Sequence, residues 1–409
     1  MINGIILNEQ QERIKNEAVY WYHHSSEQVF EIDGLAGTGK SVLIGQILRE
    51  LNLDVNQYLP MSYTGQASIV MRTRGFYTAK SIHASLYEVI EVDDESDILA
   101  ARFGARGKRK EFKLRSFIDP AIRLFFIDEA YMVPKWMVKD ILSFGIKVIV
   151  AGDAHQLPPV GDDPAFLTGN NIHHLTQLMR QAENDPIVYL SHRASKGLPI
   201  HSGQYGNNVM VIDDCDFMPQ MIGWADTLVC GTNKTRESLN AYVRQLAKFD
   251  GNFPHYGERI ICRKNNWEVC VDGISLANGL AGTVVNNPDP SGFNGNTFLV
   301  NFKPDLTDKV FYNVPVDYEY FIAPFNRKNE IKAGHNKWGF GELFDFSYAL
   351  TTHLSQGAEY PNLVYFEEFL RYDLQCQLNY TGITRAKQGL IYVKKKNKYI
   401  QIPGYKPIL

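Results

Sequence analysis

Short apolar runs separated by longer helical patterns dominate this chain. A short, mostly apolar run between longer helical patterns is typical of a parallel strand that helices cover on both faces. The clearest runs are residues 29–32, 124–127, 148–151, 227–230 and 390–393. Because these runs alternate with helical patterns, we predict an α/β architecture.

Two stretches break this alternation. Residues 86–115 begin with acidic side chains and end with basic ones, which indicates an insertion. Residues 257–341 are rich in Gly, Asn, Pro and aromatic residues and contain short alternating segments. This second pattern is typical of a small β-barrel or meander, so we treat it as a separate small domain.

Composition sets the class of protein but leaves its partner open. The chain has 409 residues, 44% of them hydrophobic and 21% charged, which predicts a globular protein of two or three domains. Its net charge of −3 neither requires nor excludes a polyanionic partner. The five cysteines form no C-x-x-C pair, so we expect a reducing cytoplasm and no structural zinc. We also expect no membrane span and no secretory leader.

The strongest local motif is a phosphate-binding loop between a predicted strand and a predicted helix. Residues 34–41 read Gly-Leu-Ala-Gly-Thr-Gly-Lys-Ser and match G-x-x-x-x-G-K-[ST]. Backbone amides of such a loop face the phosphates of a nucleotide, with the positive end of the helix dipole behind them. We expect Lys40 to reach the β- and γ-phosphates and Ser41 to bind Mg²⁺. The predicted nucleotide-binding residues of the loop are Gly34, Ala36, Gly37, Thr38, Gly39, Lys40 and Ser41.

An acidic pair follows the predicted strand at residues 124–127. Hydrolysis of a phosphoanhydride needs a carboxylate on the metal and a group that orients water. We expect Asp128 to hold Mg²⁺ through water and Glu129 to orient or deprotonate the attacking water. The alternative is an ordinary surface Asp-Glu pair at a strand end, which the neighbouring phosphate loop makes the weaker interpretation.

A third motif, Gly-Asp-Ala-His-Gln-Leu-Pro-Pro-Val at residues 152–160, follows another buried strand. Together these motifs resemble superfamily 1 helicases, in particular compact members of the RecD-like class. Further segments that match the family are spread along the chain, at residues 7–11, 63–68, 81–83, 175–181, 348–357 and 380–386. Two positions depart from the family pattern: Tyr63 replaces a proline, and Leu354 replaces a lysine found in many relatives.

The resemblance implies two RecA-like domains with ATP and Mg²⁺ between them. It implies that Arg180 and Arg385 stabilise charge on the departing phosphate, which an arginine does only while the cleft is closed. It also implies that Gln156 senses the γ-phosphate and that Gln11 binds the adenine. Gly357 and Glu359 complete the implied nucleotide site. The alternative for either arginine is an ordinary surface ion pair.

By the same resemblance, both domains contact a single strand of DNA. The implied nucleic-acid-binding residues are Thr64, His83, Thr352 and His353. The alternative for the two histidines is a hydrogen-bonded place in the core. The basic run at residues 102–115 falls where relatives carry a strand-separating pin. We expect this run, with Arg106, Lys108 and Arg109, to contact phosphates or the duplex fork, and Phe103 to act as a wedge. A solvated charged loop is the alternative.

These expectations define one arrangement of domains. Residues 1–170 form the first RecA-like domain, with the pin at 86–115; residues 171–256 and 342–409 form the second, and residues 257–341 form an inserted β-barrel. The aromatic residues of that barrel are expected to fill its core.

The predicted activity is that of an ATP- and Mg²⁺-dependent DNA helicase. We expect a monomer that moves 5′ to 3′ on single-stranded DNA and opens a duplex fork, in the cytoplasm, alongside replication or recombination proteins. The alternatives are a translocase that does not unwind, a nucleotide-switched binding module, and a small-molecule kinase. A kinase would leave the last ~60 residues without a purpose.

Overall fold

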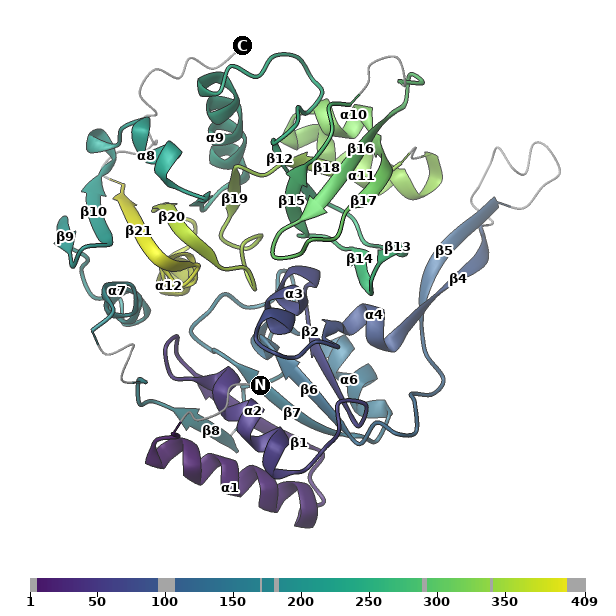
Figure 1. Ribbon diagram of the computed structural model, residues 1–409, viewed down its shortest axis with the longest axis vertical. Coiled ribbons are helices and arrows are strands. Elements are labelled where there is room, and N and C mark those ends of the chain that lie inside the picture. The colour runs from purple at the N-terminus through teal and green to yellow at the C-terminus, as the bar shows by residue number, and fades with distance from the viewer. Residues whose placement is uncertain are drawn as a thin grey trace.

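The computed structural model describes residues 6–94, 107–169, 171–179, 184–288, 293–338 and 341–395. Figure 1 shows two α/β lobes, one containing β1 and one containing β21, and an antiparallel sheet beside the second lobe. A two-stranded hairpin projects away from the first lobe (Figure 1). Within the described residues, no helix has both the length and the apolar character that crossing a bilayer requires.

The first lobe is built on a parallel sheet with the strand order β3-β2-β6-β7-β1-β8. All its neighbouring strands run parallel, as the continuous apolar runs predict. The strands are β1 (Val29–Gly34), β2 (Tyr58–Ser62), β3 (Lys80–Ser81), β6 (Leu124–Asp128), β7 (Lys147–Gly152) and β8 (Ile172–Leu175).

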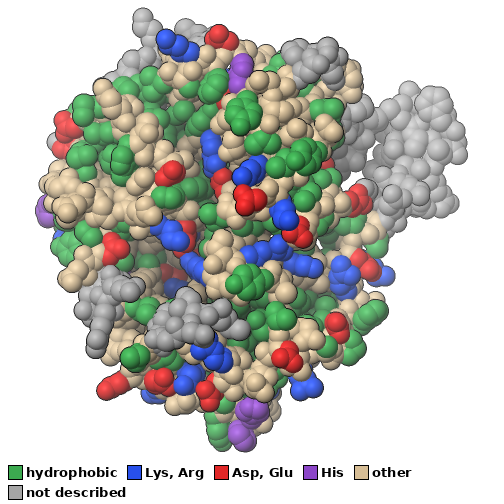
Figure 2. Space-filling model, viewed as in Figure 1, with side chains coloured by type: hydrophobic (Ala, Val, Ile, Leu, Met, Phe, Trp, Pro, Cys, Tyr) green, Lys and Arg blue, Asp and Glu red, His purple; other side chains and the backbone are tan. Residues whose placement is uncertain are grey.

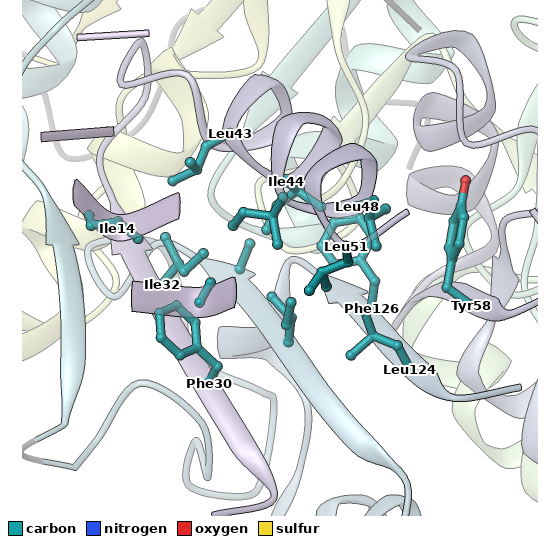
Figure 3. Close-up of a cluster of buried hydrophobic side chains, with 14 of the residues drawn as sticks. Ile14, Phe30, Ile32, Leu43, Ile44, Leu48, Leu51, Tyr58, Leu124 and Phe126 are labelled. Atoms are coloured by element: carbon teal, nitrogen blue, oxygen red, sulfur yellow. The ribbon is translucent and has the colours of Figure 1, made fainter. Parts of the chain in front are cut away.

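Helices cover both faces of this sheet. They are α1 (Glu9–His24), α2 (Lys40–Glu50), α3 (Gly65–Thr73), α4 (Ile82–Leu86) and α6 (Lys135–Ser143), with the short 3₁₀ helix η1 (Ala130–Met132). Adjacent residues of β6 show how one strand serves two cores: Phe126 packs with α1 and α2, and Phe125 packs with α6. Figure 3 shows the first core, where Leu43, Ile44 and Leu48 lie among the strand side chains.

The second lobe has a sheet of the order β19-β11-β20-β21-β10-β9, parallel except for β9. Its strands are β9 (Gly203–Tyr205), β10 (Val209–Asp213), β11 (Thr227–Cys230), β19 (Ala349–Thr351), β20 (Tyr360–Phe366) and β21 (Ala386–Lys394). Its helices are α7 (Pro186–Ser195), α8 (Gln220–Trp224), α9 (Asn233–Leu246) and α12 (Gln375–Ile383), with η2 (Asp214–Asp216) and η4 (Tyr372–Leu374). Helices α7 and α12 pack on one face of the sheet, and α8 and α9 pack on the other.

An antiparallel sheet of the order β17-β16-β15-β12-β18 is inserted between β11 and β19. Its strands are β12 (Arg259–Cys262), β15 (Ala281–Val284), β16 (Thr297–Pro304), β17 (Phe311–Asp317) and β18 (Phe344–Phe346). The hairpin β13 (Asn266–Val271) and β14 (Ile274–Leu276) extends from it, and helices α10 (Tyr318–Ile322) and α11 (Phe325–Trp338) lie between β17 and β18. Phe298, Phe302, Phe311 and Phe344 lie in its core, as expected of its aromatic residues, but the expectation is wrong for Tyr312, which is exposed because its side chain on β17 points away from the core.

The projecting hairpin pairs β4 (Tyr87–Asp94) with β5 (Gly107–Leu114) in antiparallel register. It occupies the stretch predicted as an insertion. Three residues of the predicted pin, Arg102, Phe103 and Arg106, lie outside the described residues. The side chains of Lys108 and Arg109 are likewise outside the description, although their backbones pair with Asp93 and Val92.

Two short strands belong to sheets other than those the sequence assigns them to. β8 pairs with β1, so the first sheet extends past the predicted boundary at residue 170. β18 pairs with β12, so the antiparallel sheet extends past residue 341. Both strands find their partners far away along the chain, and a local pattern carries no information about such pairing.

Candidate functional site

The phosphate loop joins the end of β1 to the start of α2. Gly37 and Gly39 adopt φ values of +83° and +81°, a left-handed backbone that favours glycine. A Cβ at Gly39 would lie 2.6 Å from both Gln11 Nε2 and Met179 Sδ, so a larger residue would have to push these two side chains aside as well as adopt the left-handed backbone. Lys40 Nζ donates to the carbonyl oxygens of Gly34 and Leu35, which holds the ammonium inside the loop.

Gln11 packs against the phosphate loop from α1. Its side chain and that of Asn8 form a capping box at the start of the helix. Its Nε2 donates to Thr38 O at 3.0 Å, and the side chain is almost fully buried. The predicted adenine-binding residue therefore lies at the loop and fixes the loop to α1.

The acidic pair lies at the carboxyl end of β6. Asp128 is the last strand residue, and Glu129 turns out of the strand with φ +54°. The pKa of the Glu129 carboxyl is raised above its ordinary value, mainly by burial. The cations Arg385 and Lys40 work to lower this pKa, whereas the neighbouring carboxylate of Asp128 works to raise it. A carboxyl whose pKa is raised toward neutrality is suited to accept a proton from water.

Ser41 and Asp128 converge on one cation, the guanidinium of Arg74. Arg74 Nη1 donates to Ser41 Oγ at 3.0 Å and lies 3.8 Å from Asp128 Oδ2. A hydroxyl and a carboxylate beside a phosphate loop are the ligands that Mg²⁺ takes together with nucleotide phosphates, so the predicted metal residues fit the ion. No cluster of three or more His, Cys, Asp or Glu among the described residues offers an alternative metal site.

Arg385 reaches the same site from the second lobe. Its side chain is 4% exposed and donates to Thr381 O at 3.0 Å and Ala358 O at 3.1 Å, both within its own lobe. Its Nη2 also donates to Gln156 Oε1 of the first lobe at 3.4 Å. Arg385 and Lys40, one cation from each lobe, both work to lower the pKa of the Glu129 carboxyl.

A tyrosine and a threonine of α12 close the cleft further. The Tyr380 hydroxyl accepts from Ala36 N at 2.7 Å and donates to Asp153 Oδ2. Thr381 Oγ1 accepts from Leu157 N at 3.0 Å. These contacts join α12 to the phosphate loop and to the predicted motif at residues 152–160, so the two lobes are closed on each other.

Asp153 is the charged group in the contact between α12 and the first lobe. Burial raises its pKa, but hydrogen bonds from His155 and Tyr380 and the nearby Lys40 outweigh burial, so the pKa lies below its usual range. The carboxylate in turn raises the pKa of His155.

The segment of the second lobe that contains Gly357 and Glu359 packs against α3. With φ +75° at Gly357, a Cβ would lie 2.6 Å from Ala67 Cβ and 3.0 Å from Thr64 Oγ1. Glu359 pairs with Arg74 and, at 3.0 Å, with Lys387. Burial alone would raise the pKa of Glu359, but Arg74 and Lys387 lower it.

A cavity of about 220 Å³ lies between the lobes and the antiparallel sheet region. Thr64 lines it from the first lobe, His353 and Leu354 line it from the second, and Asn278 lines it from the inserted segment. Tyr63, which replaces the usual proline, also lines it. Figure 2 shows a row of Lys and Arg side chains across the middle of the face drawn there, at the level where the lobes meet.

The other two predicted DNA-binding residues lie elsewhere. Thr352 is fully buried, and its hydroxyl donates to Cys230 O at 3.2 Å. His83 belongs to an aromatic cluster at the base of the β4–β5 hairpin, where its ring stacks on Trp267 with centroids 5.8 Å apart. Burial lowers the pKa of His83 to about 4, so the ring is neutral at pH 7. Burial also lowers the pKa of His353.

The cleft brings together the predicted residues Lys40, Gln156 and Arg385, whereas Arg180 lies outside the described residues. Arg74, Asp153, Tyr380 and Thr381 also lie in the cleft but are not among the predicted site residues. Asp153 lies inside the predicted motif at residues 152–160, and its position directly after a buried strand was an available signal. No local spacing marks Arg74, which only the fold brings to Ser41.

Comparisons with known proteins agree with this geometry. The family model described as "AAA domain" matches residues 6–211, half of the 409-residue chain. The model described as "UvrD-like helicase C-terminal domain" matches residues 346–393. A curated relative, ATP-dependent DNA helicase Pif1 of Bdellovibrio bacteriovorus, is 32% identical over 161 residues, which cover 36% of this chain and 33% of that protein. The aligned part therefore spans about a third of that relative's length.

Solved structures share the fold over nearly the whole chain. Pif1 helicase from Candida albicans matches with a TM-score of 0.52 and 16% identity, covering 95% of this chain and 94% of that one. Pif1 helicase from Bacteroides in complex with ADP-AlF3 and ssDNA matches with a TM-score of 0.53 and 16% identity, covering 98% and 96%. The two lobes thus have the arrangement of paired RecA-like domains. The family matches confirm the resemblance found in the motifs: the chain belongs to the superfamily 1 helicases of the Pif1/RecD-like class.

Proposed function

We propose that this chain is an ATP-dependent DNA helicase that moves along single-stranded DNA, with 5′ to 3′ polarity. One observation carries the proposal: the second lobe reaches the phosphate loop through Tyr380, which accepts from Ala36 N, and reaches Gln156 of the first lobe through Arg385. A nucleotide bound at the phosphate loop would therefore be contacted from both lobes, and its hydrolysis would change how the lobes meet.

In this proposal each polar group of the cleft has one task. Lys40 and Arg385 stabilise the negative charge that develops on the transferred phosphoryl group. Glu129 orients the attacking water and accepts its proton, for which its raised pKa suits it. Gln156 reports the state of the phosphate to the second lobe through its contact with Arg385. Mg²⁺, held by Ser41 and Asp128, would neutralise charge on the phosphates.

The strand track follows from the cavity between the lobes. Because Thr64 and His353 line one cavity from opposite lobes, opening and closing of the cleft would change the grip on a strand there. The Bacteroides Pif1 structure, which has the same fold, contains ssDNA and ADP-AlF3. We propose that Thr64 and His353 contact the strand, that Thr352 supports this segment from the core, and that Gln11, Gly357 and Glu359 contact the nucleoside.

The finer architecture belongs to the same proposal. The antiparallel sheet would serve as the small barrel that borders the strand, and the β4–β5 hairpin would serve as the pin at the duplex fork. His83 would then act at the base of that pin, where it stacks on Trp267 of the inserted segment. We propose a monomer working at the fork, in the cytoplasm.

ATP turnover, measured with and without single-stranded DNA, tests the motor. We expect Lys40→Ala to abolish turnover and to leave the fold intact, because Lys40 Nζ donates its hydrogen bonds to carbonyl oxygens of the loop and joins no other element by them. Arg371→Ala is the matched control, since that arginine is 68% exposed and pairs with Asp373 in its own turn. Surviving turnover in Lys40→Ala would refute the assigned loop, and turnover indifferent to DNA would favour a simple nucleotide switch.

Unwinding of matched tailed duplexes tests polarity and strand separation. We expect opening of the duplex with a 5′ tail. Opening from the 3′ tail alone would reverse the proposed polarity. DNA-stimulated turnover without any unwinding would identify a translocase instead of a helicase.

A further inference from the structure

Arg74 occupies the place where the metal residues and the second lobe meet. It directly follows α3, and its backbone N–H donates to Val70 O and Met71 O at the end of that helix. Its guanidinium donates to Ser41 Oγ of α2 and lies 3.8 Å from Asp128 Oδ2 of β6. Its other amino group donates to Glu359 of the second lobe. One side chain thus links three elements and both lobes.

The carboxylates around Arg74 stabilise its positive charge, and its side chain remains partly exposed to solvent. Burial works against the charge, but Glu359, Asp128 and Glu129 outweigh burial and raise the pKa of the guanidinium. The side chain is 34% exposed, so it is not locked in the core. A small cavity of about 30 Å³ lies beside it, lined by Ser41, Gly45 and Arg49 of α2.

The other end of α3 lies at the proposed strand cavity. Thr64 caps the helix by accepting from Ala67 N at 3.1 Å, and the same threonine lines the cavity. Gly357 packs on Thr64 and Ala67, and Glu359, two residues later, holds Arg74. A helix of nine residues, about 14 Å long at 1.5 Å per residue, thus joins the two places.

We propose that Arg74 competes with Mg²⁺ for Ser41 and Asp128, yields these two side chains to the metal and nucleotide, and so couples their binding to the strand cavity at the far end of α3. This inference rests on the proposed function and adds a coupling residue to it. Arg74 is a positioning residue here, because it acts through Ser41, Asp128 and Glu359.

Electrostatics supplies the reason. Two cations within a few ångströms repel each other, so a guanidinium on Ser41 and Asp128 competes with Mg²⁺ for the same oxygens. If Arg74 left Ser41 and Asp128, its link to Glu359 would weaken or move, and α3 with its cap Thr64 would be able to shift against the segment that carries Gly357 and Glu359. A strand bound at Thr64 that shifts α3 in the same direction would release Arg74 and ease metal binding.

Binding of a fluorescent, non-hydrolysable ATP analogue, titrated with Mg²⁺, tests the proposal without requiring turnover. In the wild type we expect an oligo-dT strand to lower the Mg²⁺ concentration at half-saturation. In Arg74→Ala without DNA we expect that concentration to be about fivefold lower than in the wild type, the size of a partly exposed ion pair. In this variant the strand should no longer change it.

Two further variants separate competition from damage to the fold. Arg74→Lys keeps a cation but cannot bridge Ser41 and Glu359 at once, so its Mg²⁺ requirement should stay near that of the wild type while the strand effect is lost. Arg49→Ala removes a neighbouring arginine of the same small cavity and should behave as the wild type. Thermal unfolding of each variant verifies that the chain is folded.

The outcomes distinguish this inference from the proposed function. An unchanged Mg²⁺ requirement in Arg74→Ala, or an equal change in Arg49→Ala, overturns the role of Arg74 and leaves the motor in place. A wild type that binds no nucleotide, or binds it equally after Lys40→Ala, overturns the proposed function and this inference with it.

Discussion

At the scale of single residues, a buried group of three charged side chains lies outside the nucleotide cleft. Asp345 of β18 accepts from Lys328 Nζ at 2.7 Å and from Arg236 Nη2 at 2.9 Å. Arg236 belongs to α9 of the second lobe and Lys328 belongs to α11. All three side chains are buried. The contact therefore joins the inserted antiparallel sheet to the second lobe.

Replacing Asp345 should leave two buried cations without their counter-charge. We expect Asp345→Asn to destabilise the protein by about 3–5 kcal/mol at pH 7, seen as a lower urea midpoint. Burial alone would raise the pKa of Asp345, but the cations Lys328 and Arg236 lower it by more than burial raises it. The pKa in the folded protein therefore lies below the ordinary 3.8. A depressed carboxyl pKa gives stability that is present above the ordinary pKa and is lost as pH falls through the folded pKa.

The difference between Asp345→Asn and the wild type should therefore shrink as pH falls below about 4. Asp308→Asn is the matched control, because that carboxylate is fully exposed and pairs with Lys303 on the surface. It should leave the urea midpoint nearly unchanged. A difference for Asp345→Asn that stays constant down to pH 3 would contradict this account.

Residues whose position follows from a local rule could be predicted, and residues placed by folding could not. Lys40 and Glu129 could be predicted because a loop pattern and a strand end determine where their side chains lie. Arg74 could not, because its partners Ser41, Asp128 and Glu359 come from three separate stretches of the chain. The resemblance predicted Arg385 at the cleft, where it now lies beside Gln156.

At the scale of elements, two helical glycines show how packing decides the effect of one substitution. Gly45 lies in α2, where an added Cβ would meet no described atom within 4 Å. Gly382 lies in α12, where an added Cβ would lie 2.2 Å from the ring of Tyr365. Glycine is a poor helix former at both places, so only the surroundings differ.

These surroundings predict opposite changes in stability. Gly45→Ala should stabilise the protein by about 0.5–1 kcal/mol, because alanine has the higher helix propensity. Gly382→Ala should destabilise it by about 1–3 kcal/mol, because the methyl group displaces a buried ring. Urea midpoints of the two variants measure the difference. Equal shifts would mean that Tyr365 moves aside without cost.

Element types followed from the sequence more readily than their neighbours did. The run at residues 227–230 is β11, with the same limits, because four consecutive buried residues, three of them apolar, leave little choice. β3, with two residues, and β8, whose burial is mixed, carry no apolar run strong enough to detect. Short edge strands depend on a partner far along the chain, so tertiary context decides whether they form.

At the scale of the whole molecule, the two lobes are joined through α12. Its Tyr380 and Thr381 contact Ala36, Asp153 and Leu157 of the first lobe. Gln356 adds a bond to Leu157 O at 2.9 Å. Since these partners belong to the phosphate loop and to the motif that carries Gln156, the closed form is held by the same segments that the proposed motor uses. Release of these bonds is therefore the expected opening movement.

Amide hydrogen exchange in the nucleotide-free protein tests this closure. The N–H of Ala36 is bonded to the Tyr380 hydroxyl, so Tyr380→Phe should speed exchange in the phosphate-loop peptide several-fold. Exchange in peptides of β1, which pairs with β7 inside the first sheet, should stay as it is. Thr381→Val should act in the same way on the peptide that contains Leu157. Unchanged exchange at both peptides would show that contacts other than those of α12 hold the lobes together.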